Sequence, residues 1–252
     1  MAEQSKTPPD ASDRKNRFVL VVDSSLENLK YTATLLRRFG YQTYTATRAM
    51  DALEITSVKV PSLIITALNL KDMDGLELVK QIKRDPRTAG VRFIALTRQG
   101  DMVQEARCYE AGELDCIPAP VAAEQLYRIV QTVIETPPRM NMRIRTMLPI
   151  KVTNVPLDDR EGAYTLELSE RGMFVRIAEP APLNMRLSVQ IDLRGQTIPV
   201  EAAVLYRHQD DRGPYREPGM GLGFVQIAAK DQENIRKFIV SEVTRGLAPA
   251  NA

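Results

Sequence analysis

Two arginines, Arg139 and Arg143, stand four residues apart in a short segment that is rich in positive charge. Side chains at this spacing share a face in a helix and in a strand, so both guanidinium groups can reach one ligand. From Pro137 to Lys151 the chain has four basic side chains, including Arg145, and no acidic one. A guanidinium group grips phosphate in a fork and can also stack on a purine ring. The segment therefore predicts a site for an anion.

A second polar pattern, E-x-S-x-x-G, is formed by Glu167, Ser169 and Gly172. Polar and apolar residues alternate from Ala163 to Ser169, which predicts a strand with one polar face. The alternation assigns Tyr164, Leu166 and Leu168 to one side and Thr165, Glu167 and Ser169 to the other. Gly172 has no Cβ, so a ligand can approach the backbone closely where the chain turns. Glu167 and Ser169 are expected to face solvent or a ligand together.

An R-x-x-x-R segment followed by [D/N]-x-S-x-x-G at a strand end resembles the PilZ domain. The resemblance implies that Arg139 and Arg143 hold the phosphates and guanine edges of cyclic di-GMP. It also implies that Ser169 and Gly172 complete the pocket, with Arg145 as a further candidate. One position departs from the family pattern: its short Asp or Asn is Glu167 here. The carboxylate can still accept from guanine N–H groups, but it lies one methylene further out.

Each of these residues also has an ordinary structural interpretation. Arginines in a polar linker are usually solvated, and Glu167 could be an outward strand residue. Ser169 could make a local hydrogen bond within a turn. The nucleotide site is favoured because the residues occur together at the family spacing.

The first half of the chain alternates apolar strands with helical patterns, starting with the continuously apolar run at Arg17 to Val22. Five strand and helix repeats in residues 17–135 predict a doubly wound α/β domain with a parallel five-stranded sheet. The short motifs at the ends of these elements resemble those of a response-regulator receiver domain. The matching marks are V-V-D at Val21–Asp23, M-D-G at Met73–Gly75, L-T at Leu96–Thr97 and A-G-E-L-D-C-I-P-A-P at Ala111–Pro120.

The resemblance also identifies what is missing from this receiver-like domain. The family's phosphoacceptor Asp corresponds to Ala67, and its Lys before the proline corresponds to Ala119. Of the acidic pair that binds Mg²⁺, only Asp23 remains, followed by Ser24, whereas Thr97 is intact. Alanine has no nucleophile, and a lone carboxylate is a poor site for a hard divalent cation. We expect a receiver that cannot be phosphorylated, with Asp72 or Asp74 as a less favoured acceptor.

Pro137 and Pro138 end the last receiver helix, so residues 136–146 are predicted to be a linker that carries the arginine pair and is mobile until ligand binds. Residues 147–245 predict a small antiparallel β-barrel with a C-terminal helix, which also resembles PilZ architecture. Leu183 to Leu193 alternates with period two, and Arg194-Gly195 is the expected hairpin turn into Thr197–Arg207. Residues 1–16 and 246–252 are predicted to be tails, the first of them disordered.

Composition excludes several classes of function. The chain has 252 residues, 44% of them hydrophobic, and a net charge of +2, so no general attraction to nucleic acid or to a membrane is predicted. No apolar run approaches the ~18 residues of a membrane span, and no secretion signal is apparent, which favours a cytoplasmic protein. Cys108 and Cys116 are predicted to be small side chains of the fold, neither disulfide-bonded nor bound to zinc with His208, which is expected at the surface.

These observations predict a non-enzymatic bacterial signalling protein without a cofactor or metal. It would bind cyclic di-GMP in the second domain and pass the signal on through contacts of the receiver-like domain with itself or with an unidentified protein. The alternative is an interaction or scaffold protein whose PilZ-like domain is degenerate at Glu167 and binds no nucleotide. A phosphorelay output protein is a third possibility, disfavoured by Ala67.

Overall fold

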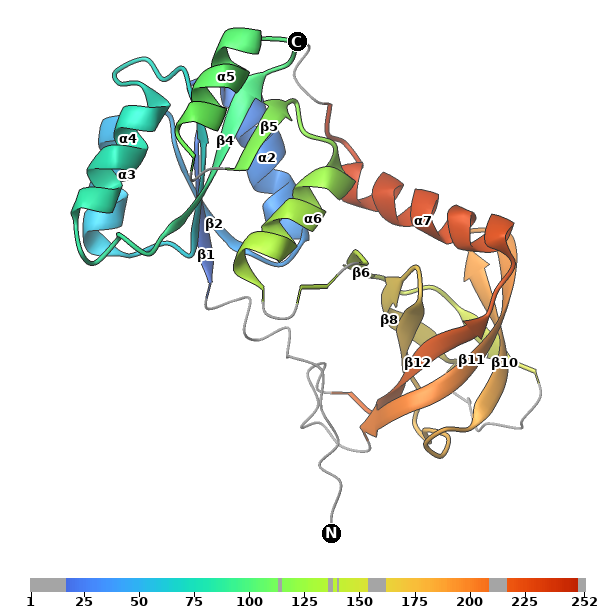
Figure 1. Ribbon diagram of the computed structural model, residues 1–252. Coiled ribbons are helices and arrows are strands. Elements are labelled where there is room, and N and C mark those ends of the chain that lie inside the picture. The colour runs from blue at the N-terminus through green and yellow to red at the C-terminus, as the bar shows by residue number, and fades with distance from the viewer. Residues whose placement is uncertain are drawn as a thin grey trace. The chain divides into compact units, whose positions relative to one another are not determined.

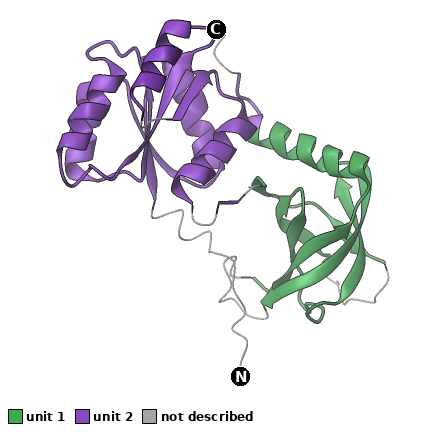
Figure 2. Cartoon of the chain, in the orientation of Figure 1, with its two compact units in different colours: residues 1–10, 141–243 green, residues 11–140, 244–252 purple. Residues whose placement is uncertain are grey.

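The computed structural model describes residues 17–112, 115–135, 138–139, 141–153, 162–208 and 217–248. The chain splits into two compact units, one of residues 11–140 with 244–252 and the other of residues 1–10 with 141–243 (Figure 2). The predicted N-terminal tail and residues 249–252 lie outside the described residues. Within the described part of the chain, no helix is both long enough and apolar enough to cross a membrane.

The first unit is built on a parallel sheet with strand order β2-β1-β3-β4-β5. The strands are β1 (Phe18–Val22), β2 (Gln42–Ala46), β3 (Leu63–Ala67), β4 (Arg92–Arg98) and β5 (Asp115–Ala119). The helices are α2 (Leu26–Arg38), α3 (Ala49–Val58), α4 (Gly75–Arg84), α5 (Met102–Glu110) and α6 (Ala123–Ile134). Helices α2 and α6 cover one face of the sheet, and α3 and α4 cover the other (Figure 1). The predicted doubly wound α/β class is confirmed.

The local sequence explains these elements. All five residues of β1 are buried, as expected for a central strand covered on both faces. Helix α2 begins after Ser25, whose hydroxyl accepts from the amide of Asn28, and α4 begins after Asp74, whose carboxylate accepts from the amide of Leu76. Each side chain satisfies an amide that has no partner inside its own helix.

The two cysteines differ from the expectation. Cys108 of α5 and Cys116 of β5 form a disulfide, with their Cα atoms 6.2 Å apart. The prediction of two separate thiols was wrong because an eight-residue spacing carries no pairing signal by itself. The pair meets because α5 packs back over the strand that follows it.

The second unit is a seven-stranded sheet with order β6-β8-β9-β12-β11-β10-β7, whose pairings are all antiparallel. Its strands are β6 (Arg143–Arg145), β7 (Ile150–Val152), β8 (Tyr164–Ser169), β9 (Gly172–Arg176), β10 (Arg186–Leu193), β11 (Gln196–His208) and β12 (Gly219–Gln226). It is followed by helix α7 (Ala229–Thr244). The sheet curls as a half-barrel, which confirms the predicted antiparallel β domain with a C-terminal helix.

The two edges of this sheet meet on one chain segment, residues 143–152. Its first part pairs with β8 and its last part with β10. Between them, the carbonyl of Leu148 accepts from Thr165 at 2.9 Å, and the carbonyl of Pro149 accepts from Asp192 at 3.0 Å. Residues 143–145, predicted as linker, are therefore a strand of the sheet. The expectation that they are mobile until ligand binds does not fit this pairing.

The hairpin of β10 and β11 turns at Arg194 and Gly195, as predicted. Both have positive φ, 55° and 96°, which suits a two-residue hairpin turn. The turn also presents Arg194 to α7, where its guanidinium pairs with Glu242 at 2.8 Å and lies over the ring of Phe238. The alternation predicted from Leu183 to Leu193 would bury Leu183, but this residue is 53% exposed.

Gly75 provides a test of packing at the end of β3. A Cβ at this position would overlap the carbonyl oxygen of Ala67. We expect Gly75→Ala to destabilise the first unit by about 1–3 kcal/mol, as overpacking of a tight site does. Urea denaturation of the full chain measures this. Gly90→Ala is the control, since nothing lies within 4 Å of its added Cβ. Equal midpoints for both variants would contradict the close packing.

Candidate functional site

The pairing of β6 with β8 brings the predicted binding residues of the second unit together. Arg143 lies opposite Ser169, and Arg145 lies opposite Glu167. Ile144, between the arginines, is 7% exposed and lies opposite the fully buried Leu168. Because side chains of a strand alternate between faces, both arginines project to the outward face while Ile144 faces the core.

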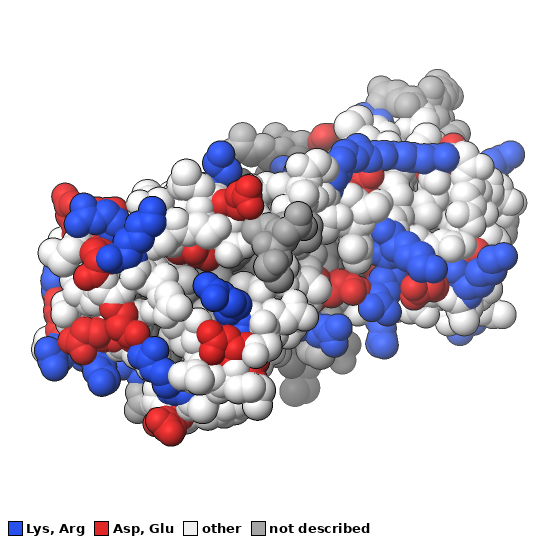
Figure 3. Space-filling view, turned by 90° about the horizontal axis from the view of Figure 1, so that it is seen from above, with Lys and Arg blue, Asp and Glu red and all other residues white. Residues whose placement is uncertain are grey.

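An ion pair connects the two motifs on this face. The Nη1 atom of Arg143 donates to Oε2 of Glu167 at 3.2 Å, and the two side chains are 35% and 16% exposed. Arg145 is exposed. Arg145 also lines a pocket with Asp192, Glu217 and Glu242, so the charge around it is mixed. On the face seen in Figure 3, Lys and Arg lie among Asp and Glu.

Ser169 and Gly172 have structural roles that the sequence left open. The hydroxyl of Ser169 donates to the carbonyl of Gly172 at 2.9 Å, and Ser169 is only 8% exposed. This hydrogen bond is the one expected if Ser169 has the ordinary structural role of bonding within a turn. A Cβ at Gly172 would lie 2.5 Å from the carbonyl oxygen of Leu222, so the pairing of β9 with β12 by itself requires glycine there.

The predicted strict alternation of β8 was wrong at Thr165. The register between β8 and β9 shifts between Thr165 and Glu167, which is a β-bulge. Thr165 is fully buried, and its hydroxyl lies 2.6 Å from that of Thr146 and accepts from the amide of Leu148 at 3.0 Å. The bulge lets Thr165 point inward and bond Thr146 and Leu148, while Glu167 still projects outward.

Two aromatic residues beside this face were missed by the sequence reasoning. Phe174 lies opposite Glu167 and also opposite Gly221, which in turn lies opposite Tyr206. The two rings are stacked with centroids 6.0 Å apart, and His208 packs against both, half-buried rather than at the surface. A Cβ at Gly221 would overlap the ring of Tyr206. The glycine repeat of β12 was the available signal, because bare strand positions are often covered by neighbouring rings.

Arg139 belongs to the other compact unit. Its backbone amide donates to Oε1 of Gln131 in α6 at 2.9 Å. The two arginines of R-x-x-x-R thus fall on either side of the unit boundary at residues 140 and 141.

The residues of the receiver-like site gather at one edge of the parallel sheet. Asp23 follows β1, Ala67 ends β3, Thr97 is next to last in β4 and Ala119 ends β5. These four strands are neighbours, and the carboxyl ends of parallel strands lie at the same edge. The sequence-predicted residues are therefore brought together, although two of them are alanines.

Asp23 and Ser24 hold the loops at this edge. The carboxylate of Asp23 accepts from the amide of Ser25 at 2.8 Å. The hydroxyl of Ser24 donates to the carbonyl of Thr47 at 3.2 Å and accepts from the amide of Lys71 at 3.1 Å. Among the described residues, the hydroxyl oxygen of Thr97 is buried and has no hydrogen-bond partner.

Asp72 and Asp74, the alternative acceptors, already have partners. Asp72 accepts from the amides of Ala49 and Met50 at 2.9 and 3.0 Å and so caps α3. Asp74 caps α4 and pairs with Arg107 of α5 at 2.7 Å. Both carboxylates hold neighbouring helices in place.

The buried Asp23 predicts how stability depends on pH. Burial raises the pKa of Asp23 above its usual value, and the bonds from Ser25 and Asn28 offset this only in part. The folded state therefore holds the proton more tightly, and this contribution to stability is lost as the pH rises through the raised pKa. We expect Asp23→Asn to be more stable than wild type at pH 7, with the difference disappearing below about pH 4.

Thermal unfolding of both proteins from pH 3.5 to pH 8 checks this expectation. Asparagine keeps the carbonyl that accepts from Ser25, so the comparison isolates the charge. A difference that is the same at every pH would contradict it, and so would a less stable variant at pH 7.

Comparison with known proteins agrees with both units. Residues 19–131 match the response regulator receiver domain, and residues 137–241 match the PilZ domain. The sensor histidine kinase RcsC of Escherichia coli K12 is 30% identical over 118 residues, which is 47% of this chain and 12% of the kinase. The sporulation initiation phosphotransferase F of Bacillus subtilis is 28% identical over 44% of this chain and 88% of its own length.

Solved structures are also similar to part of this chain. The chemotaxis response regulator CheY4 of Vibrio cholerae is 24% identical, with a TM-score of 0.43, over 46% of this chain and 98% of its own. A putative response regulator from Chloroflexus aurantiacus is 26% identical, with a TM-score of 0.45, over 47% of this chain and 97% of its own. The chain spans only 12% of the length of the RcsC kinases that it matches. On the matches of residues 19–131 and 137–241, this chain consists of a response-regulator receiver domain followed by a PilZ domain.

Proposed function

We propose that this protein is a bacterial cyclic di-GMP receptor that passes the signal on through protein contacts and catalyses no reaction. The observation that carries the proposal is the outward face of the β6 and β8 pair. There Arg143, Arg145 and Glu167 lie together in a domain that matches PilZ. Guanidinium groups suit the phosphates of the ligand, and a carboxylate suits the N–H groups of its guanines.

Each residue has a role that its geometry allows. Arg143 uses one nitrogen for Glu167, and its remaining N–H groups can grip a phosphate oxygen. The carboxylate of Glu167 can accept from the N–H groups of a guanine edge, and Arg145 is exposed and can neutralise a phosphate. The hydroxyl of Ser169 is oriented by its bond to the carbonyl of Gly172 and retains acceptor capacity on its oxygen.

We further propose that the receiver domain does not take a phosphoryl group. Ala67 offers no nucleophile, and Ala119 offers no ammonium group to balance a phosphoryl oxygen. Asp72 and Asp74 are engaged in capping helices, which supports their exclusion as substitutes. The domain would then act as a fixed scaffold in the cytoplasm that contacts a second copy or another protein.

The position of the two arginines suggests how binding could be transmitted. Arg139 and Arg143 belong to different compact units. Ligand binding at Arg143 would favour one conformation of the short segment that carries Arg139 over others. Because residues 143–145 already form a strand, the conformational change on ligand binding would be confined to the residues before β6.

The second candidate is an interaction protein that binds no nucleotide. It is favoured by the Arg143–Glu167 ion pair, since a carboxylate already occupies part of the guanidinium that the ligand would need.

Calorimetric titration with cyclic di-GMP tests the receptor. We expect Arg143→Ala to weaken binding at least tenfold, because each charge-assisted hydrogen bond contributes roughly 1.5–3 kcal/mol. Arg207→Ala is the matched control, since Arg207 is an exposed arginine of β11 and its removal changes the net charge equally. It should bind like wild type.

The absence of a heat of binding would favour the second candidate. If neither wild type nor Glu167→Asp, which restores the short acidic side chain of the family pattern, gives a heat of binding, the receptor proposal is abandoned.

Incubation with acetyl phosphate followed by mass spectrometry tests the receiver. We expect no phosphoryl group on any aspartate of residues 17–135, because the nucleophile is missing at Ala67. The CheY-type receivers serve as the positive control. A labelled peptide containing Asp23, Asp72 or Asp74 would overturn the proposal.

A further inference from the structure

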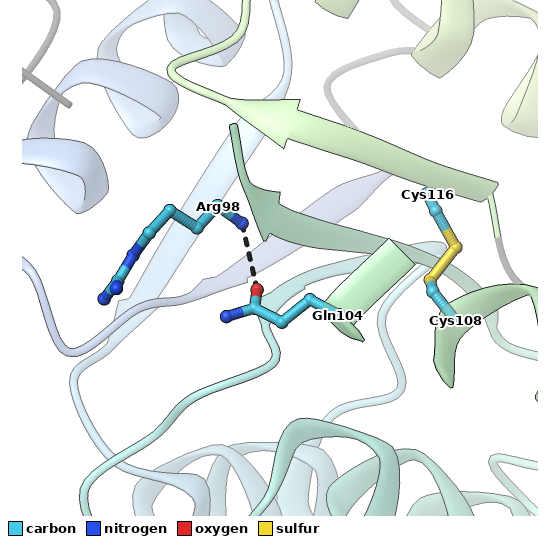
Figure 4. The surroundings of a disulfide bond; sticks show 4 residues. All are labelled: Arg98, Gln104, Cys108 and Cys116. Atoms are coloured by element: carbon cyan, nitrogen blue, oxygen red, sulfur yellow. Dashed lines mark hydrogen bonds between the residues drawn. A yellow bond between two sulfur atoms is a disulfide. The ribbon is translucent and has the colours of Figure 1, made fainter. Parts of the chain in front are cut away.

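We infer that Cys108 and Cys116 form a redox-active dithiol and disulfide couple that sets how firmly helix α5 is held on the receiver sheet. The disulfide joins the last turn of α5 to the strand β5 that follows it (Figure 4). It closes a short loop, because the two residues are eight positions apart. This role is independent of nucleotide binding in the second unit.

Helix α5 has few apolar anchors of its own. Its buried side chains are Gln104 and Cys108, whereas α2 buries six side chains and α6 buries five. Buried apolar area is the main source of helix docking energy, so α5 depends more than its neighbours on other attachments. The cross-link is therefore a large part of what holds this helix.

The remaining attachments of α5 are polar. Oε1 of Gln104 accepts from the amide of Arg98 at the end of β4, at 2.9 Å (Figure 4). Arg107 pairs with Asp74 at 2.7 Å, but both side chains are more than a third exposed, so solvent screens the pair. These contacts position α5 without anchoring it strongly, which leaves the disulfide as the tightest constraint.

The opposite side of α5 carries three large hydrophobic side chains that are open to solvent. Met102 is 74% exposed, Val103 69% and Tyr109 80%. A change in how firmly α5 is held changes how rigidly this surface is presented. The redox state of the cysteines would thus alter the outer surface of the receiver domain without any phosphoryl group.

The chemistry balances with a small thiol such as glutathione. Cys116 is only partly buried and Cys108 is fully buried, so the attacking thiolate reaches the sulfur of Cys116. Attack forms a mixed disulfide on Cys116 and releases the thiolate of Cys108. A second thiol then frees Cys116, so two glutathione thiols become one glutathione disulfide as the protein gains two electrons and two protons. The reverse sequence, driven by glutathione disulfide, closes the bond.

The test uses the full chain equilibrated with excess glutathione disulfide or with excess reduced glutathione. Thiol trapping and mass spectrometry count the free cysteines, and hydrogen exchange measures the amides of α5. We expect a closed bond in the first buffer and two thiols in the second. We also expect the amides of α5 to exchange roughly tenfold faster or more after reduction, as loss of a short cross-link allows.

Cys116→Ser supplies the control, because it removes the bond at a partly exposed position. It should exchange like reduced wild type in both buffers, while the amides of β1 and α2 stay unchanged in all samples. The inference is overturned if the bond stays closed in excess reduced glutathione, if the thiols stay free in excess disulfide, or if reduction leaves the exchange of α5 unaltered.

Discussion

The antiparallel pairing of β6 with β8 is the constraint on which the candidate site depends. Its register sets Arg143 beside Ser169 and Arg145 beside Glu167. A shift by one residue would turn both arginines into the core and Ile144 outward, which burial of Ile144 strongly opposes. One apolar side chain thus fixes the direction of two charged ones. The outward direction of the two arginines is therefore a consequence of the burial of Ile144.

The same segment also completes the sheet. Residues 143–152 pair with β8 at one end and with β10 at the other, so the candidate site residues and both edges of the curled sheet share one stretch of backbone. The bulge after Thr165 makes this possible, because Thr165 turns inward to bond Thr146 and Leu148 while Glu167 stays outward. A ligand at Arg143 would therefore act on a strand that is already ordered, and any conformational response would arise before it.

The first unit differs from the second, because the polar side chains at the carboxyl edge of its parallel sheet make structural contacts. Carboxylates that follow β3 cap helices, and Ser24 connects two loops through its hydroxyl. The buried hydroxyl of Thr97 lacks a partner among the described residues, in a place where two neighbouring strands end in alanine. Contacts between side chains and loop backbone thus stabilise the carboxyl edge of the parallel sheet. Helix α5, which buries few apolar side chains, carries the disulfide.

The strands and helices of the first unit, and the long hairpin and last helix of the second, could be predicted from the sequence alone. Periodicity of two and of 3.6 residues reports which nearby side chains are buried. The resemblance of their motifs to the PilZ pattern also predicted that Arg143, Glu167 and Ser169 lie together. Only the tertiary structure decided that Arg143 belongs to a paired strand, that Thr165 faces inward and that Cys108 meets Cys116. These features depend on contacts between residues far apart in the chain or on a single shift of register. Local patterns carry no information about either.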